Sequence, residues 1–399
     1  MIEDNQILKI IERKNHLFQE DIDDNEIFLR NEISSSKFLV IGAAGSIGKS
    51  VIKEIFSRNP QSIHLVDINE NNLVELVRDL RSNFNSIDSD LKTFCLDCGS
   101  YIFEQFFKNQ HRYDYILNLS AMKHVRSERD PYTLMRMIET NVLNTNKTLA
   151  LSKEINPKKY FCVSTDKASN PVSLMGASKR IMEMFLMKES ESLNISTSRF
   201  ANVAFSDGSL LYGFIQRLNN FQPISAPKDI QRYFVTPKES GQLCLMSCLL
   251  GENKNIFFPN KSDEVKLINF KKITENFLNL KGFESFECES EDEARRKIKE
   301  LNSLNKWPCY FFESDTSGEK EYEEFFMEEE KIDFKKFKDI GVIFSSLTYS
   351  SDKLNTFLKD LQKIKLKGNW NKLEISNLFK EVIKDLNHIE TGKNLDQKM

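Results

Sequence analysis

The sequence predicts an α/β protein with a doubly wound parallel β-sheet, a smaller second lobe and a helical C-terminal tail. Of the 399 residues, 40% are hydrophobic and 29% are charged, a balance typical of folded globular chains. From residue 37 onward, short apolar runs alternate with polar stretches of helical pattern. Such alternation indicates βαβ units, which build a parallel sheet covered by helices on both faces.

Six apolar runs are the predicted strands of this sheet. They are residues 38–41, 63–68, 93–96, 115–119, 160–163 and 195–200. After residue 200 the alternation becomes irregular, as expected of a smaller lobe. We therefore predict four parts, namely an amphipathic helical leader (1–33), the sheet domain (34–200), the smaller lobe (201–318), which we expect to be interleaved with the sheet domain, and an acidic, helical appendage (319–399).

Three features of the second half of the chain receive their own predictions. The aromatic-rich segment 306–315 is expected to be a strand and loop that lies in the core, caps a site or contacts another subunit. The Glu-rich run 319–330 is most simply a solvated helix face. Residues 354–364 and 373–386 have the spacing of amphipathic helices.

Charge, hydropathy and cysteine content limit the function classes. The chain has 56 Lys and Arg against 59 Asp and Glu, a net charge of −3, which argues against a dedicated nucleic-acid binder. The best apolar run, 243–250, is much shorter than the roughly 20 residues of a membrane span. Charges throughout 1–14 disfavour a secretory signal, and seven scattered cysteines suit a reducing compartment. We expect a cytoplasmic protein without a membrane span.

A glycine-rich loop lies between the first predicted strand and a helical stretch at 49–57. The candidate ligand-binding residues in it are Gly42, Ala44, Gly45, Ser46, Ile47 and Gly48. Glycine allows the backbone to turn sharply and to approach a pyrophosphate closely, and the N-terminus of the helix offers N–H groups to the phosphates. The sequence therefore predicts a dinucleotide-binding loop.

Two carboxylates follow the next strands. Asp67 ends the second strand, where a carboxylate accepts hydrogen bonds from the adenosine ribose and repels a 2′-phosphate, so NAD is favoured over NADP. Asp97 follows the third strand and is a candidate partner of the adenine amino group, although an exposed Asp explains it nearly as well. Cys95 and Cys98 form a CxxC pair, but no second pair or His pair accompanies them, so we predict no metal site.

Candidate catalytic residues follow the fifth strand. Thr165, Asp166 and Lys167 place a hydroxyl, a carboxyl and an amine side by side at the carboxyl edge of the sheet, where parallel sheets bind ligands. These groups are suited to hydrogen bonding, general acid and general base catalysis. Met175 and Lys179 lie four residues apart, on one face of the helix that follows.

The stretch from Ser164 to Lys179, STDKASNPVSLMGASK, closely resembles nucleotide-sugar 4,6-dehydratases of bacterial polysaccharide biosynthesis that act on UDP-N-acetylglucosamine. These are extended short-chain dehydrogenase/reductase proteins, whose fold is Rossmann-type. The resemblance extends from about Lys37 to Pro259. It includes the segments 121–125, 140–142, 199–203, 207–209 and 231–236.

The resemblance implies an intramolecular redox cycle with NAD as cofactor. Oxidation at sugar C4 makes a ketone that acidifies the C5 hydrogen, water is eliminated across C5 and C6, and the hydride returns to C6. By the same resemblance, Lys167 is the base at C5, Asp166 protonates the C6 oxygen, Thr165 binds the 4-hydroxyl and Lys179 binds the nicotinamide ribose. Ser120 is implied as a further cofactor-binding residue. Lysine must be neutral to act as a base, and desolvation near the cofactor would lower its pKa.

One position departs from most short-chain dehydrogenases, which have Tyr four residues before the Lys. Met175 stands there and cannot exchange a proton. The same Met occurs in the branch that resembles large membrane-anchored dehydratases, which retain the configuration at C5. We therefore expect a C5-retaining enzyme without membrane segments, in which Thr165 relays the 4-hydroxyl proton to Asp166 or water.

Further residues are matched by resemblance to the substrate side. They are Lys123, His124, Asn202, Ser209, Arg217 and Arg232. Arginine suits phosphate oxygens, and Arg232 is the favoured pyrophosphate clamp. For His124 a packed or capping role is the alternative, and for Arg217 a solvated helix face fits equally well.

Other functions stay open at this stage. A C5-inverting dehydratase or a nucleotide-sugar epimerase would share the fold and cofactor, and a non-catalytic NAD-binding scaffold is a third class. The expected partner is a UDP-sugar, with a GDP-sugar as alternative, and no nucleic acid. A homo-oligomer is expected.

Overall fold

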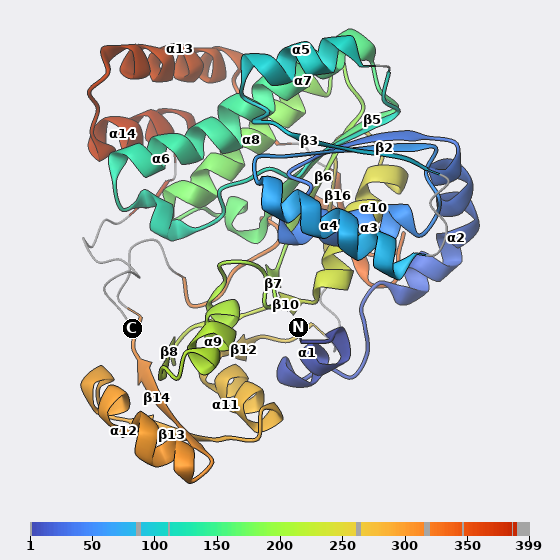
Figure 1. Cartoon of the computed structure of the whole chain (residues 1–399). Helices are drawn as coiled ribbons and strands as arrows, with labels where there is room; N and C mark the ends of the chain where they lie inside the picture. The colour runs from blue at the N-terminus through green and yellow to red at the C-terminus, as the bar shows by residue number, and fades with distance from the viewer. Residues whose placement is uncertain are drawn as a thin grey trace.

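The computed structural model describes residues 2–84, 89–110, 112–260, 265–314, 320–344, 347–384 and 386–388. A nine-stranded sheet forms the centre of the molecule, in the order β15-β16-β11-β6-β5-β4-β1-β2-β3 (Figure 1). Its strands are β1 (Lys37–Ile41), β2 (Ser62–Asp67), β3 (Asp90–Cys95), β4 (Tyr115–Asn118), β5 (Lys159–Thr165), β6 (Ile195–Phe200), β11 (Asn255–Pro259), β15 (Lys331–Asp333) and β16 (Ile340–Phe344).

The sheet confirms the predicted α/β fold class. Strands β3, β2, β1, β4, β5, β6 and β11 are parallel neighbours, and β16 and β15 add an antiparallel edge. The first six strands correspond to the six predicted apolar runs. Since the strand order reverses between β1 and β4, the carboxyl ends of these two strands border the crevice where doubly wound sheets bind ligands.

Helices cover both faces of this sheet. On one face α10 packs against α3, α2 and strands β5 and β6, while on the other α8 packs against the same two strands and α7 (Figure 1). The helices of the two layers are α2 (Gln19–Ser34), α3 (Ser46–Phe56), α4 (Glu70–Asn83), α5 (Tyr101–Asn109), α7 (Asn144–Ile155), α8 (Leu174–Glu189) and α10 (Pro237–Leu250).

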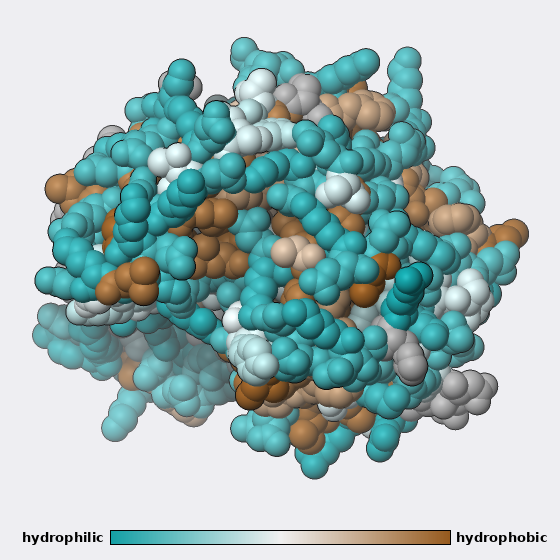
Figure 2. All heavy atoms as spheres, turned by 90° about the horizontal axis from the view of Figure 1, so that it is seen from above, coloured by the Kyte–Doolittle hydropathy of each residue, from teal (hydrophilic) through white to brown (hydrophobic). Residues whose placement is uncertain are grey.

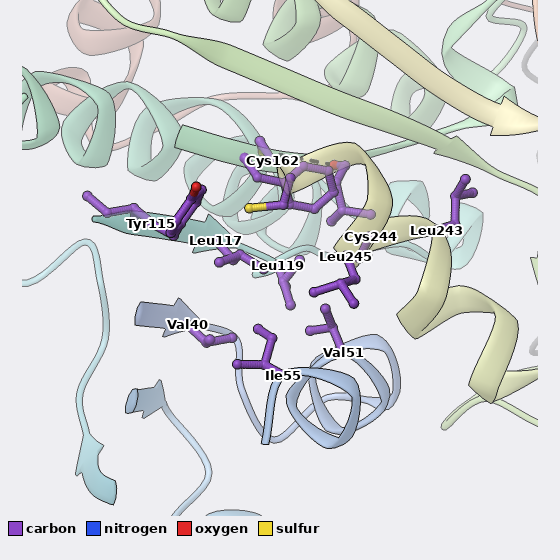
Figure 3. Close-up of a cluster of buried hydrophobic side chains, with 14 of the residues drawn as sticks. Val40, Val51, Ile55, Tyr115, Leu117, Leu119, Cys162, Leu243, Cys244 and Leu245 are labelled. Atoms are coloured by element: carbon purple, nitrogen blue, oxygen red, sulfur yellow. Dashed lines mark hydrogen bonds between the residues drawn. The ribbon is translucent and has the colours of Figure 1, made fainter. Parts of the chain in front are cut away.

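The main hydrophobic core lies between the sheet and these helices. Figure 3 shows side chains of the strands, among them Val40 of β1 and Leu117 of β4, facing side chains of the helices, among them Val51 of α3 and Leu245 of α10. Each of these four is buried. Strands buried on both faces are continuous apolar runs, which is why the sequence identified them so readily.

The smaller lobe contains a separate core around a three-stranded sheet. Its strands are β13 (Glu284–Cys288), β14 (Lys306–Phe312) and β8 (Ile224–Pro227), all parallel. Helices α1 (Asp4–Ile10), α9 (Leu210–Asn219), α11 (Phe270–Leu280) and α12 (Glu291–Ser303) surround it (Figure 1). Two strand pairs connect it to the main domain, β7 (Asn202–Val203) with β10 (Phe234–Val235) and β9 (Gln231–Arg232) with β12 (Ile268–Asn269).

The predicted aromatic strand at 306–315 is β14, whose Trp307 and Cys309 are buried in the core of the lobe. Asp315 lies outside the described residues. The predicted leader is helical in α1 and α2, but it spans both parts of the molecule, because α1 packs on the lobe and α2 on the main domain. Between them, Arg13 and the Leu17 amide donate to the buried carboxylate of Glu239 in α10.

The two predicted C-terminal helices correspond to α13 (Ser351–Lys367) and α14 (Lys372–Val382), and the second ends earlier than predicted. They pack on α8 and on α6 (Pro131–Ile138), which leads through η2 (Glu139–Leu143) into α7 (Figure 1). Phe357 and Phe379 are buried in the apolar cluster that joins these helices. Residue 385 and residues 389–399 lie outside the described part.

The prediction that the acidic run 319–330 is a solvated helix face is wrong. Glu319 lies outside the described residues, and the described part, 320–330, has no helix. Glu323 is only 4% exposed and Glu330 only 8%, and Phe325 is completely buried. Burial is possible because arginines from distant parts of the sequence contact this segment, as described below. The chain then continues into β15 and β16 at the edge of the central sheet.

Figure 2 shows the face seen from above Figure 1, where polar side chains predominate and apolar ones are scattered between them. Scattered apolar side chains are normal for a protein surface and need no further explanation. Among the described residues, no helix has both the length and the hydropathy of a membrane span.

Candidate active site at the carboxyl edge of the sheet

The glycine-rich loop connects β1 to α3 and requires glycine for two different reasons. Gly42 has a φ of +77°, and a Cβ there would lie 2.6 Å from the Ser120 amide nitrogen. A Cβ on Gly48 would collide with the Gly42 carbonyl oxygen. These two glycines therefore serve the tight turn and the close packing of helix on strand.

Gly45 is different, because the protein itself does not require a glycine there. The residue is exposed, its φ is −75°, and a Cβ would meet only the Gly42 carbonyl oxygen at 3.6 Å, an ordinary contact. Gly45 is the N-cap of α3, so the space beside it lies at the positive end of a helix. This bare, open N-terminus fits the close approach of a phosphate group.

The polar residues predicted to contact a dinucleotide surround this loop. The Asp67 carboxylate accepts the Ala44 and Asn69 amides, each at 2.9 Å, which places it directly beside the glycine-rich loop. The Ser120 hydroxyl, after β4, donates to Asn118 Oδ1 at 2.8 Å. Ile47, at the start of α3, packs against the main core and is half-buried.

Asp97 makes contacts within the protein that the sequence did not indicate. Its carboxylate accepts the Gly99 amide at 2.8 Å and Arg136 Nη2 at 3.1 Å. The nearby Cys98 is buried, which raises the pKa of its thiol, while Cys95 is exposed. No group of three or more potential metal ligands occurs in the described part of the chain.

Thr165, Asp166 and Lys167 lie where β5 ends and the short helix η3 (Asp166–Ala168) begins. One oxygen of the buried Asp166 carboxylate, Oδ1, accepts three hydrogen bonds, from Thr165 Oγ1 at 2.9 Å, from the Lys167 amide at 2.8 Å and from Lys167 Nζ at 3.1 Å. The Lys167 side chain retains 19% exposure. The structure thus brings the hydroxyl, the carboxyl and the amine into direct contact.

Lys179 and Met175 lie on α8, beside the same strand. Lys179 is buried, its Nζ donates to the Val163 carbonyl at 3.0 Å, and burial lowers the pKa of this amine. Met175 is 3% exposed and belongs to the apolar cluster under α13 and α14, while its amide donates to Glu128 Oε1 at 2.7 Å. Burial raises the pKa of Glu128.

A buried ionic network, which the sequence analysis did not identify, packs against the predicted catalytic stretch at the end of β5. Arg199 on β6 is completely buried and pairs with Glu183 of α8 at 2.9 Å and with Glu330 at 2.7 Å. Ser164, the residue before Thr165, donates to Glu183 Oε1 at 2.6 Å. Burial alone would raise the pKa of Glu183, but Arg199 and Arg180 lower it overall.

Glu323 is a second residue that the sequence analysis missed. Its Oε1 lies 3.7 Å from Lys167 Nζ, although the two residues are about 150 positions apart in the sequence. No spacing or motif in the sequence relates the two residues. The only signal in the sequence of this segment was its closely spaced glutamates, and these predicted a solvated helix face.

The substrate-side candidates fall into two groups. Lys123, His124 and the 206–209 loop lie together, because Lys123 Nζ donates to Ser206 Oγ at 3.1 Å and His124 packs on Gly208. The Asp207 amide donates to Ser46 Oγ at 2.9 Å, so this group also meets the N-terminus of α3. Burial lowers the pKa of Lys123 and that of His124, the latter to about 4.

The remaining candidates differ in how many hydrogen bonds their side chains already make within the protein. The buried Nδ2 of Asn202 has no hydrogen-bond partner among the described residues. Ser209 caps α9, and Arg217 pairs with Gln222 at 3.2 Å. Arg232 is 5% exposed, and its Nη1 donates to the carbonyls of Gln231, Lys320 and Glu321. Its predicted contact to pyrophosphate remains a prediction.

Solved structures with the same fold are numerous. The chain resembles Pen from Bacillus thuringiensis with a TM-score of 0.65 at 19% identity, over 83% of this chain and 98% of that one. A UDP-N-acetylglucosamine 4-epimerase from Methanobrevibacter ruminantium superposes with a TM-score of 0.55 at 16% identity, over 84% and 100%. A dTDP-glucose 4,6-dehydratase from Streptomyces venezuelae, solved with NAD, has a TM-score of 0.53 at 16% identity, over 70% and 88%.

The fold, with its glycine-rich loop between β1 and α3, is the Rossmann-type α/β fold that these solved structures share. Residues 38–344 match the polysaccharide biosynthesis protein family, and the chain belongs to that family. An uncharacterized membrane protein of Methanocaldococcus jannaschii is 27% identical over 89% of this chain and 98% of its own length. The capsular polysaccharide biosynthesis protein CapD of Staphylococcus aureus is 29% identical over 69% of this chain, which spans only 46% of CapD.

Proposed function

We propose that the protein is an NAD-dependent nucleotide-sugar 4,6-dehydratase that acts on UDP-N-acetylglucosamine and retains the configuration at C5. The observation that carries the proposal is the contact between Lys167 Nζ and Asp166 Oδ1, 3.1 Å apart at the carboxyl end of β5. Elimination of water needs a base and an acid close to two adjacent carbons, and these side chains are suited to the two roles. Membership of the polysaccharide biosynthesis protein family supports a sugar nucleotide as substrate.

The glycine-rich loop would hold the cofactor. Gly45 and the N-terminus of α3 would face the phosphates, and the Asp67 carboxylate, beside the loop, would accept hydrogen bonds from the ribose. A negative charge at this place disfavours the 2′-phosphate of NADP. Bound NAD would supply a reversible hydride acceptor for sugar C4 and C6, and Lys179 would bind its nicotinamide ribose.

The catalytic side chains would then manage the protons. Once C4 is a ketone, the C5 hydrogen is acidic, and neutral Lys167 removes it as the C5–C6 double bond forms. Asp166, in its protonated form, gives its proton to the C6 oxygen, which leaves as water. After hydride has been added at C6, Lys167 returns a proton to C5, so the amine ends the cycle as it began.

Thr165 would take the place of the missing phenol. Its hydroxyl donates to Asp166 at 2.9 Å, so a proton from the sugar 4-hydroxyl could pass through Thr165 and restore the acid form of Asp166. Met175 cannot take part, because its thioether has no exchangeable proton. Normal turnover by a correctly folded Thr165→Val variant would rule this relay out.

The substrate would be held by polar groups on the lobe side. Asn202 offers a buried amide without a hydrogen-bond partner in the described chain, which fits a role in binding a polar ligand. Lys123 and His124 lie at the same edge of the sheet and could reach the sugar. Ser209, Arg217 and Arg232 remain proposed contacts of the nucleotide diphosphate, and of these Arg232 is the most buried.

A nucleotide-sugar epimerase is the second candidate, because several UDP-glucose 4-epimerases are about a quarter identical to this chain, such as that of Rickettsia massiliae at 26%. Incubation of the purified protein with UDP-N-acetylglucosamine, followed by mass spectrometry and NMR, separates the candidates. We expect a product that has lost one water and retains the configuration at C5. A product of unchanged mass with altered stereochemistry would establish an epimerase, and inversion at C5 would establish the other kind of dehydratase.

A further inference from the structure

Glu323 brings a third ionisable side chain to the proposed catalytic pair. It lies in the segment 320–330, which has no regular secondary structure and runs between the lobe and β15. Its side chain is 5% exposed, and its Oε1 is 3.7 Å from Lys167 Nζ. Lys167 is therefore bracketed by two carboxylates, Asp166 at 3.1 Å and Glu323 at 3.7 Å.

Distant side chains fix the segment on both sides of Glu323. On one side, Arg232 Nη1 donates to the carbonyls of Lys320 and Glu321, and the Gln231 amide also donates to the Glu321 carbonyl at 3.0 Å. On the other side, Arg199 donates to the Phe325 carbonyl at 2.9 Å and pairs with the Glu330 carboxylate. An irregular segment held in this way presents its side chains in one defined position.

The burial of Glu323 needs a compensating partner, because a buried charge without one is strongly unfavourable. Four charged groups act on it. Lys167, Arg232 and Lys320 favour the carboxylate, and Asp166 opposes it. Burial, which is the largest influence, together with Asp166 raises the pKa of Glu323 above its usual value. Lys167 is the one cation that forms an ion pair with Glu323 among the described residues.

We propose that Glu323 is a positioning residue of the active site, which acts through Lys167 by holding its amine beside Asp166 and by adding a negative charge next to it. The inference rests on the proposed function, in which Lys167 is the base at C5. The sequence assigned this segment no role, and the contact exists only because Arg199 and Arg232 fasten the segment against the catalytic stretch.

Replacement of Glu323 by Gln removes the charge and keeps the shape of the side chain. A unit charge 3.7 Å from an amine changes its pKa by between about one and about three pH units, depending on the local dielectric. Because a negative neighbour stabilises the ammonium form, its loss lowers the pKa of Lys167. We therefore expect the acid limb of kcat/KM in Glu323→Gln to move to lower pH by at least about one unit.

The matched control is Glu324→Gln. Glu324 is the next residue, but it is turned away and accepts a hydrogen bond from Asn170 at 3.0 Å on the exposed surface. Its acid limb should coincide with that of the unmodified protein. If Glu323→Gln melts far below the unmodified protein, Glu323→Asp serves instead. This variant keeps the carboxylate charge but places it farther from Lys167. The acid limb of its kcat/KM profile should therefore lie between those of Glu323→Gln and the unmodified protein.

A direct measurement on Lys167 separates this inference from the proposed function. Competitive acetylation of the apo protein across a pH series, read by peptide mass spectrometry, reports the pKa of the Lys167 amine without turnover. We expect a lower pKa in Glu323→Gln than in the unmodified protein. Equal labelling curves and equal acid limbs would overturn the role of Glu323 alone, whereas failure of the unmodified protein to form a dehydrated sugar would overturn the proposed function.

Discussion

The substitution Gly45→Ala tests the proposed cofactor site without disturbing the protein. A methyl group there would meet only the Gly42 carbonyl oxygen, at 3.6 Å, and the φ of −75° suits any L-residue. Ala is a poorer N-cap than Gly, but it also reduces the entropy of the unfolded chain, and each effect is worth about 0.5 to 1 kcal/mol. The two oppose each other, so the free energy of unfolding should change by less than about 0.5 kcal/mol.

The effect on the cofactor should be much larger. If the phosphates lie against Gly45, the new methyl group stands between them and the amides of α3. We expect the Kd for NAD to rise at least tenfold, which is about 1.4 kcal/mol. Isothermal titration calorimetry with NAD gives this Kd, and thermal unfolding of the same sample without NAD gives the stability.

Gly42→Ala is the matched contrast. Its φ of +77° costs a residue with a Cβ roughly 1 to 2 kcal/mol, and the Cβ would press on the backbone of Ser120 and Leu119. It should therefore lose stability as well as affinity. NAD binding by Gly45→Ala with the affinity of the unmodified protein would refute the reasoning, because it would mean that no phosphate approaches Gly45.

Two further predictions concern buried charge. Arg199→Met leaves the carboxylates of Glu183 and Glu330 buried without their main partner. Chemical denaturation should therefore show that the free energy of unfolding falls by about 3 to 5 kcal/mol. A fall below about 1 kcal/mol would contradict the proposed structural role of the network. The pKa of His124 is lowered to about 4, below its value in the unfolded chain, so the unfolded state binds the proton more readily and stability should fall as the pH drops from about 6.5 to about 4. His124→Asn should lack this part of the fall, about 3 kcal/mol at most, and denaturation curves of both proteins at pH 7 and pH 4.5 measure the difference.

Local sequence pattern was sufficient to predict the central sheet. Strands β1, β2, β4 and β5 are mostly apolar and buried because helices cover them on both faces, and such runs are visible in the sequence without knowledge of the fold. After residue 200 the pattern became less clear, because β8 is short and β13 is largely exposed, although the aromatic run of β14 was still visible. Strand β13, for example, contains Glu284 and Glu287, and only its Cys288 is buried.

The predicted catalytic stretch and the glycine-rich loop could be recognised as candidates because each is contiguous in the sequence. Glu323 and Glu330 could not, since what decides their burial is the position of Arg199 and Arg232, about 90 to 130 residues away. A cluster of glutamates predicts a solvated surface unless buried cations are known to face it. Asn202 was predicted by resemblance. Only the structure shows that its side-chain amide nitrogen has no hydrogen-bond partner in the described chain.

The exchange of hydrogen at sugar C5 tests the central claim, that Lys167 and Asp166 carry out an elimination. The purified protein is incubated with UDP-N-acetylglucosamine in deuterated water, and the product is analysed by NMR and mass spectrometry. We predict a dehydrated sugar nucleotide that carries deuterium at C5, and no such product from a folded Lys167→Met variant. A dehydrated product formed equally well by Lys167→Met, or a product that keeps its water and its original C5 hydrogen, would contradict the account.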